Sequence, residues 1–147
     1  MGRLNKLFAT AMGLGYLPKA PGTFGTLAGV LLFYATSGLS LLHYIVFVVV
    51  FIVLSVWIAD GARAAFASED PKQVVIDEVA GFLVAMIGHS WSIKTVVAGF
   101  ILFRLFDIFK PFPVGYIDRK LKGGLGIVMD DVMAGVYANM VLFIVRS

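Results

Sequence analysis

The sequence has no cysteine, few charges and only two histidines, and each shortage narrows the chemistry available to it. Without cysteine there is no thiol nucleophile, no thiolate metal ligand and no disulfide in this chain. Charged residues make up 14% of the 147 residues and hydrophobic residues 60%. Soluble domains have roughly 25% charged and about 45–50% apolar residues, so this composition indicates a chain that lies in a bilayer. The net charge of +3 is too small and too dispersed for a nucleic-acid surface, and it fits contact with anionic membrane lipids.

Apolar runs that approach the roughly 20 residues of a membrane span dominate the chain. The clearest covers residues 39–59, where His43 is the only possible charge. Turn-forming Gly, Pro and Ser residues separate the apolar runs, which predict helices over 24–36, 39–59, 79–87, 93–109 and 127–145. We expect one all-α domain over residues 1–147, a polytopic membrane helix bundle of about five spans, with the run 79–87 extending in both directions. Residues 7–17 are expected to form a short helix near the interface.

Charge placement predicts the orientation of these spans. With the N-terminus in the cytoplasm and five crossings, ten Lys and Arg residues fall on the inner side, and only Lys94 and Arg146 fall on the outer side. The positive-inside rule therefore favours an N-in, C-out topology. The same topology places all nine carboxylates on the inner side and both histidines on the outer side. Because acids do not follow the positive-inside rule, their clustering predicts a cation site at the inner membrane surface.

Five carboxylates border the predicted spans. Asp77 and Glu78 open the third span, Asp107 lies in the last turn of the fourth, and Asp130 and Asp131 lie in the first turn of the fifth. Hard oxygen ligands of this kind suit Mg²⁺, and ionisable groups at spans tend to mark function. A plainer interpretation is also open, because acids at a helix N-terminus are stabilised by the helix dipole.

Positively charged groups stand beside these acids. Arg104 and Lys110 each lie three residues from Asp107, so a purely structural ion pair is one interpretation. The other is phosphate binding, since arginine can hold a phosphate through two parallel hydrogen bonds. The segment Pro-Gly-Thr-Phe-Gly-Thr over 21–26 precedes the first span on the same side and offers the Thr23 hydroxyl and free backbone N–H groups to an anion, or serves only as a helix cap.

Four motifs in this order resemble those of phosphatidylglycerophosphatase A. They are Pro-Gly-Thr-Phe-Gly-Thr at 21–26, Asp-Glu-Val-Ala-Gly at 77–81, Phe-Arg-Leu-Phe-Asp-Ile-Phe-Lys-Pro at 103–111, and Gly-Gly-Leu-Gly-Ile-Val-Met-Asp-Asp-Val-Met-Ala-Gly at 123–135. Any one of them alone would be weak, whereas the ordered set is specific. The resemblance extends from about residue 7 to the last span.

The resemblance implies an enzyme of the bacterial inner membrane with its active site facing the cytoplasm. Members of this family hydrolyse phosphatidylglycerophosphate to phosphatidylglycerol and phosphate with Mg²⁺, as a step of phospholipid biosynthesis. Carried over by position, the implied catalytic residues are Glu78, Asp107 and Asp131. The implied metal ligands are Asp77, Glu78, Asp107, Asp130 and Asp131, and the implied phosphate contacts are Thr23, Arg104 and Lys110. Water and an aspartate both remain open as the attacking group, and the oligomeric state is left open.

Three other classes of protein compete with this interpretation. A phosphatidyltransferase is hinted at by Asp60-Gly61-Ala62-Arg63, but the spacing is one residue short and the later acidic element of that signature is absent. A cation transporter would need polar residues near the middle of the bilayer, where these spans have almost none. A purely structural membrane subunit is the third alternative.

Overall fold

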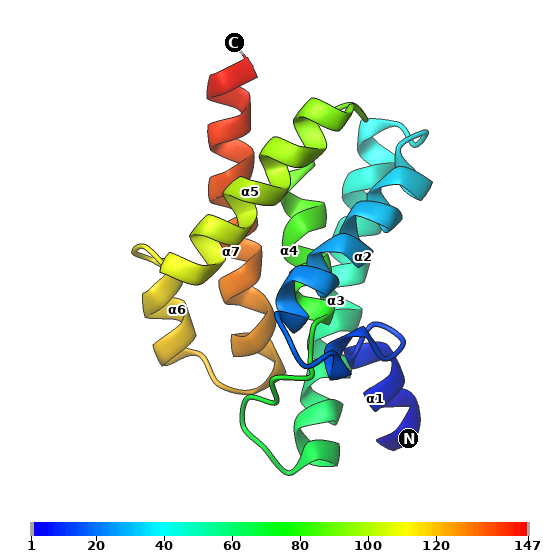
Figure 1. The fold of residues 1–147 in the computed structure, drawn as a ribbon, viewed down its shortest axis with the longest axis vertical. Coiled ribbons are helices and arrows are strands. Elements are labelled where there is room, and N and C mark those ends of the chain that lie inside the picture. Colours follow the sequence, from blue (N-terminus) through cyan, green and yellow to red (C-terminus); the bar gives the residue numbers. More distant parts are fainter. Residues whose placement is uncertain (1, 147) are drawn as a thin grey trace.

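The computed structural model describes residues 2–146, and every regular element within them is a helix, so the predicted all-α class is confirmed (Figure 1). The elements in chain order are α1 (Gly2–Ala9), the short 3₁₀ turn η1 (Leu14–Tyr16), α2 (Pro21–Thr36), α3 (Leu41–Phe66), α4 (Ile76–Ala85), α5 (Ile93–Phe109), α6 (Val114–Lys120) and α7 (Gly123–Arg146). The helix expected over residues 7–17 is wrong in position, because α1 ends at Ala9 and the glycines at 13 and 15 lie in turns.

Within residues 2–146, two helices are long and apolar enough to cross a membrane. They are α3, with 26 residues, and α7, with 24 residues. Only 17% of the most apolar stretch of α3 is buried inside the protein, so its apolar side chains point outward, unlike those of a soluble core helix. Helices α2, α4 and α7 run in one direction along the long axis and α3 and α5 in the other (Figure 1). The count of five spans and their orientation stay predictions.

The third predicted span is a short central helix. The run 79–87 extends toward the N-terminus as expected, to Ile76, but the expected extension toward the C-terminus is wrong, because the helix ends at Ala85. Helix α4 has ten residues, about 15 Å of helix, and all of them except Asp77 and Glu78 are buried. It can end inside the bundle because side chains satisfy the carbonyls near its C-terminus. The Tyr44 hydroxyl donates to the Leu83 carbonyl at 2.8 Å, and the Asn139 amide donates to the carbonyls of Ala85 and Ile87 at 2.9 and 2.8 Å.

Local signals in the sequence set the other helix ends. Pro21 opens α2 at its first turn, where a missing N–H costs nothing. Ser40 and Ser92 cap α3 and α5 by accepting hydrogen bonds from backbone N–H groups three residues on. Helix α7 begins at Gly123, whose φ of +78° is tolerated by glycine. The predicted helix positions around 24–36, 39–59, 93–109 and 127–145 are therefore confirmed.

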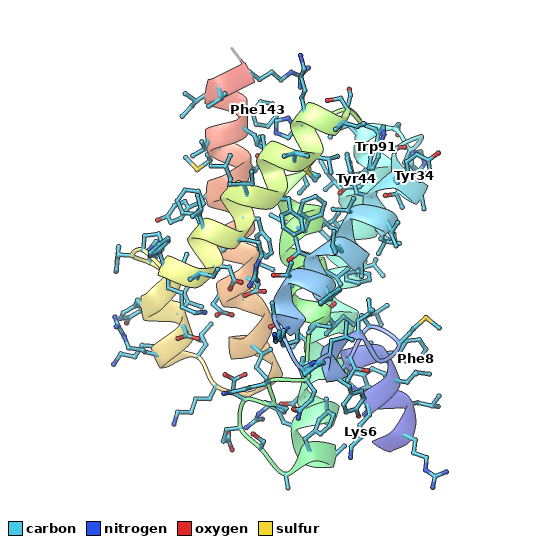
Figure 2. The ribbon with its side chains drawn as sticks, in the orientation of Figure 1. Lys6, Phe8, Tyr34, Tyr44, Trp91 and Phe143 are labelled. Atoms are coloured by element: carbon cyan, nitrogen blue, oxygen red, sulfur yellow. The ribbon has the colours of Figure 1, made fainter. Side chains whose placement is uncertain are left out.

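The two ends of the bundle differ in chemistry, as the side chains in Figure 2 show. Trp91 lies between Phe33 and Tyr34, with ring centroids 5.7 and 4.8 Å apart, at the end that holds the C-terminus. Rings of this kind are typical of membrane interfaces. At the opposite end, α1 packs on the last turns of α3, where the Lys6 ammonium lies 4.6 Å from the centre of the Phe66 ring. The polar cleft described next lies toward this second end.

Candidate active site

One cleft gathers most of the charge in the molecule. It has a volume of about 610 Å³ and lies where the N-terminal turns of α2, α4 and α7 meet the C-terminal end of α5, with α6 and the loop after α3 at its rim. Eight of the nine carboxylates in the sequence line it, all except Asp60, together with five basic side chains. The predicted gathering of acids at one end of the bundle is thus present in the structure, from elements far apart in the chain.

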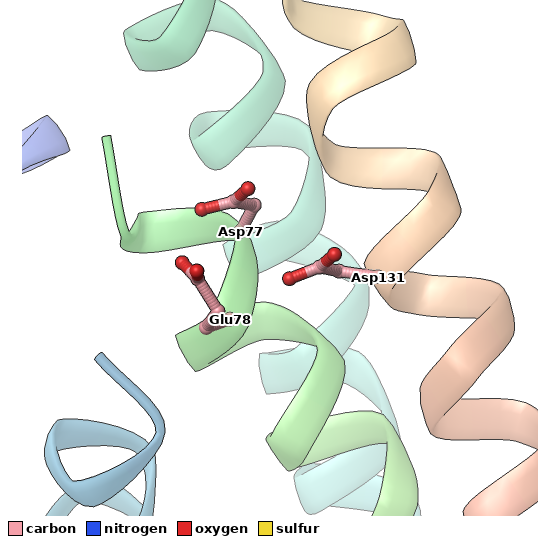
Figure 3. Close-up of side chains that lie close together, drawn as sticks. All are labelled: Asp77, Glu78 and Asp131. Carbon is pink, nitrogen blue, oxygen red and sulfur yellow. The ribbon is translucent and has the colours of Figure 1, made fainter. Parts of the chain in front are cut away.

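The deepest acids are Asp77 and Glu78 in the first turn of α4 and Asp131 on α7 (Figure 3). One carboxylate oxygen from each lies within 4.8 Å of the other two. Each residue also has a buried oxygen with no hydrogen-bond partner, and none of the three has an ion pair within 4.0 Å among residues 2–146. Three carboxylates, each with one buried oxygen that has no partner among residues 2–146, repel one another, and a cation bound between them would relieve that repulsion.

Glycines bring the acidic triad together. A Cβ atom at Gly135 of α7 would lie 2.2 Å from the Gly81 carbonyl oxygen of α4, and a Cβ atom at Gly81 would lie 2.6 Å from the Asp131 carbonyl oxygen. The two backbones therefore touch, as in other small-residue helix contacts. Asp77 and Glu78 stand one turn before Gly81, and Asp131 stands one turn before Gly135, so the contact sets their separation.

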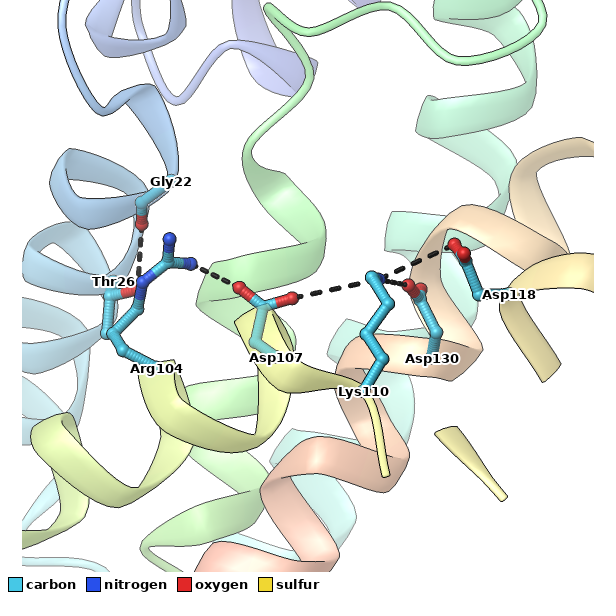
Figure 4. Close-up of polar contacts among 7 residues, drawn as sticks. All are labelled: Gly22, Thr26, Arg104, Asp107, Lys110, Asp118 and Asp130. Atoms are coloured by element: carbon cyan, nitrogen blue, oxygen red, sulfur yellow. Dashed lines mark hydrogen bonds and ion pairs between the residues drawn. The ribbon is translucent and has the colours of Figure 1, made fainter. Parts of the chain in front are cut away.

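A second group of acids is neutralised by the chain itself (Figure 4). Arg104 forms a short ion pair with Asp107 within α5. The Lys110 ammonium, just beyond α5, lies 2.5 Å from Asp130 on α7, 3.5 Å from Asp118 on α6 and 4.0 Å from Asp107. The expected pairing of Asp107 with Arg104 and Lys110 is present, and Lys110 links three helices.

The surroundings of Lys110 keep it charged. Burial alone would lower its pKa, but the hydrogen bond with Asp130 and the negative charges of Asp130, Asp118 and Asp131 outweigh burial and raise the pKa of Lys110 above its ordinary value. The ammonium is thus a permanent positive charge in the cleft at neutral pH.

The motif at 21–26 reaches the cleft through its backbone. Pro21 and Gly22 line the cleft, and a Cβ atom at Gly22 would lie 2.6 Å from Glu78 Oε1 and 2.8 Å from Arg104 Nη1. Thr23, predicted as a phosphate contact, is half-buried and is not among the lining residues, so its role stays a prediction. The Thr26 hydroxyl donates to the Gly22 carbonyl at 2.8 Å and so braces the first turn of α2.

Sequence reasoning gave no role to two acids that the structure uses. Asp118, on α6, contacts Lys110 from eight residues away, a spacing that matches no helical neighbour rule. Asp60, on α3, accepts a hydrogen bond from the Gly124 N–H at 3.0 Å and pairs with Arg63, so it fixes the start of α7. The Asp60–Arg63 segment therefore has a structural explanation.

The donor set fits a divalent cation. The acidic triad offers oxygen ligands of the type that Mg²⁺ takes, with room in the cleft for waters and a phosphate. The five acids predicted as ligands fall into two groups in the structure. Asp107 and Asp130 form ion pairs with Arg104 and Lys110, whereas the other three have no ion pair within 4.0 Å among residues 2–146. Arg104 Nε is buried and has no hydrogen-bond partner among the described residues, so a donor remains for an anion beside the triad.

A helical bundle with apolar outer faces, and with a cleft of carboxylates and basic side chains at its helix ends, has the features expected of a membrane enzyme that binds a charged headgroup. The family model described as phosphatidylglycerophosphatase A matches residues 7–146, and the chain belongs to this family. It is accordingly a lipid phosphatase, as its resemblance implied.

Individual relatives agree over nearly the full length. Two relatives are named phosphatidylglycerophosphatase A. The chain is 38% identical to that of Haemophilus influenzae, over 95% of this chain and 87% of the relative. It is 33% identical to that of Escherichia coli, over 95% of this chain and 81% of the relative. A Bacteroides thetaiotaomicron protein, 36% identical over 95% of this chain and 92% of its own length, is named "Putative phosphatidylinositol-3-phosphatase". No solved structure matches the chain.

Proposed function

We propose that this protein hydrolyses phosphatidylglycerophosphate to phosphatidylglycerol and inorganic phosphate, with Mg²⁺, at the cytoplasmic face of a bacterial inner membrane. The observation that carries the proposal is the acidic triad of Asp77, Glu78 and Asp131, three carboxylates that each have a buried oxygen without a partner among residues 2–146, next to the partly unpaired guanidinium of Arg104. The names of two relatives support this substrate.

The reaction cleaves the ester bond between phosphorus and the glycerol oxygen. The oxygen of water joins phosphorus, and the departing glycerol oxygen takes up a proton. When bound by the acidic triad, Mg²⁺ would neutralise phosphate charge and activate the attacking water. Asp77, Glu78 and Asp131 hold the ion, and the free Nε–H of Arg104 donates to a phosphate oxygen, while its pairing with Asp107 fixes the orientation of the guanidinium.

The second possible route is attack by a carboxylate followed by hydrolysis of an aspartyl-phosphate. Acid quenching of the enzyme during turnover of substrate labelled in its terminal phosphate separates the two routes. Label retained on denatured protein indicates the covalent route, and protein without label indicates direct attack by water.

The lipid nature of the substrate fits the position of the cleft. Exposed apolar side chains cover α3 and much of α7, and the cleft lies toward the end of the bundle that carries most of the basic residues. Acyl chains of a substrate can stay in the bilayer while the headgroup enters the cleft. By the positive-inside rule this end faces the cytoplasm.

The deciding measurement is phosphate release from phosphatidylglycerophosphate by the purified protein in detergent, with Mg²⁺ and with EDTA. We expect release that disappears in EDTA and in a folded Asp131→Asn variant. A parallel assay with phosphatidylinositol 3-phosphate tests the substrate suggested by the Bacteroides relative. Release from that lipid alone would overturn the headgroup assignment, and no release from either lipid by folded protein would overturn the proposed activity.

The membrane side needs its own test. Inside-out and right-side-out bacterial membrane vesicles are treated with a membrane-impermeant amine reagent, and modification is read at Lys120, an exposed lysine near the cleft end. Modification in inside-out vesicles only is expected, and modification in right-side-out vesicles only would reverse the orientation.

A further inference from the structure

The Lys110 ammonium holds a position that a metal ion would otherwise fill. Three carboxylates from three helices converge on its Nζ atom: Asp130 at 2.5 Å, Asp118 at 3.5 Å and Asp107 at 4.0 Å. Three oxygen-bearing groups from separate elements around one positive charge resemble the ligand arrangement of a cation site. In this chain the charge is supplied by a covalently attached side chain.

The two cation positions are neighbours. Asp130 and Asp131 are adjacent on α7, and Asp130 binds Lys110 while Asp131 belongs to the acidic triad. Enzymes that transfer phosphoryl groups often use two cations side by side, one at the attacking and one at the leaving oxygen. Here the structure offers one position with three unpaired carboxylates and one position already occupied by an ammonium.

The backbone at Lys110 favours a different residue. Lys110 has a φ of +46° in the left-handed region, directly after the last turn of α5. Glycine is the usual residue at this place, because it has no side chain to crowd the left-handed backbone. A lysine in this conformation is strained, and the contacts of its ammonium can offset that strain.

We propose that the active site binds a single divalent ion, at Asp77, Glu78 and Asp131, and that the Lys110 ammonium takes the place of the second. The inference rests on the proposed function and deepens it. A phosphate in the cleft would then lie between one metal ion and one fixed ammonium. At such a position a lysine acts as a point charge, and no metal ion has to bind for that charge to be present.

The test counts Mn²⁺ ions bound to the purified full-length protein in detergent, by equilibrium dialysis with metal analysis and by electron paramagnetic resonance. We expect one Mn²⁺ per chain in the wild type, with the spectrum of an isolated ion. Lys110→Gly suits the local backbone and removes the ammonium from among Asp107, Asp118 and Asp130, with Asp107 still paired with Arg104. This variant is expected to bind two Mn²⁺, with spectral broadening from the close pair.

Matched variants control for charge and folding. Lys110→Arg keeps the positive charge and is expected to bind one Mn²⁺. Lys120→Ala removes a lysine of α6 that lies outside the cleft, 6.0 Å from the Tyr116 ring, and is also expected to bind one. If Lys110→Gly is not monodisperse, Lys110→Asn takes its place, since asparagine also tolerates the left-handed region.

Two Mn²⁺ in the wild type, none in the wild type, or any count other than two in the folded Lys110→Gly or Lys110→Asn variant would overturn the inference. Phosphate release measured on the same preparations keeps the two proposals apart. One Mn²⁺ without release from phosphatidylglycerophosphate would overturn the proposed function and leave the cation count standing. Metal-dependent release with two Mn²⁺ in the wild type would overturn the cation count and leave the proposed function standing.

Discussion

Replacing Gly135 by alanine tests whether the contact between α4 and α7 sets the geometry of the acidic triad. The new Cβ atom would lie 2.2 Å from the Gly81 carbonyl oxygen, whereas ordinary contact begins at 3.4 Å, so the two backbones must separate by about 1.2 Å. No side-chain rotation can relieve this clash, because the neighbour is backbone. Asp77 and Glu78 would move with α4, away from Asp131.

Two effects of different size follow from this separation. Overpacking of this kind costs about 1–3 kcal/mol of stability. A misplacement of about 1 Å at reacting groups lowers the rate roughly 100-fold. We expect Gly135→Ala to lose about two orders of magnitude in phosphate release and to bind Mn²⁺ more weakly, while remaining folded by size-exclusion chromatography.

The control is Gly38→Ala in the loop between α2 and α3, where an added Cβ meets nothing within 4 Å. Its turnover, melting temperature and Mn²⁺ affinity are expected to equal those of the wild type. Unchanged turnover and unchanged Mn²⁺ affinity in Gly135→Ala would refute the reasoning, because the acidic triad would then tolerate the separation of its helices.

Three further changes probe single contacts. Asp131→Asn removes one charge of the acidic triad and should lower turnover by roughly 100-fold or more. Mg²⁺ should raise the melting temperature of the wild type but not of this variant. An equal rise in both proteins would place the ion elsewhere. Arg104→Lys keeps the charge, but a lysine cannot bind Asp107 and a phosphate at the same time. We expect kcat/KM to fall about 10–100-fold while the Mn²⁺ affinity stays similar. Wild-type kinetics in this variant would exclude Arg104 from phosphate binding. Asp60→Ala removes the acceptor of the Gly124 N–H and should lower stability by about 1 kcal/mol in chemical denaturation, and a loss of Mn²⁺ binding without loss of stability would contradict its structural role.

The sequence predicts all five main helices because each is an apolar run between turn residues. For α4 it does not predict where the helix ends, since an apolar run of about nine residues looks the same whether it spans a membrane or ends inside a protein. What ends α4 is distant in the chain: Tyr44 and Asn139 supply donors to its last carbonyls. Neither the periodicity nor the composition of 79–87 contains that information.

The sequence likewise predicts only part of the candidate site. The side of the bundle on which each acid lies follows from the topology, so their gathering could be predicted. The division into paired and unpaired acids could not, because it depends on the turn at Lys110 and on where α6 places Asp118. The motif at 21–26 was expected to contribute the Thr23 hydroxyl, whereas the close approach is made by Gly22, whose missing side chain leaves room for Glu78 and Arg104.

Helix packing and cation binding in this cleft depend on each other. The contact of Gly81 with Gly135 holds three carboxylates together that would repel one another without a cation. The free N–H groups of the first turn of α4 offset part of that repulsion, because the helix dipole favours acids there. We expect a bound cation to offset the rest, and such an ion would then stabilise the same helix contact that creates its site. The second group of acids needs no added ion, because the Lys110 ammonium is part of the chain. Its ion pairs connect α5, α6 and α7.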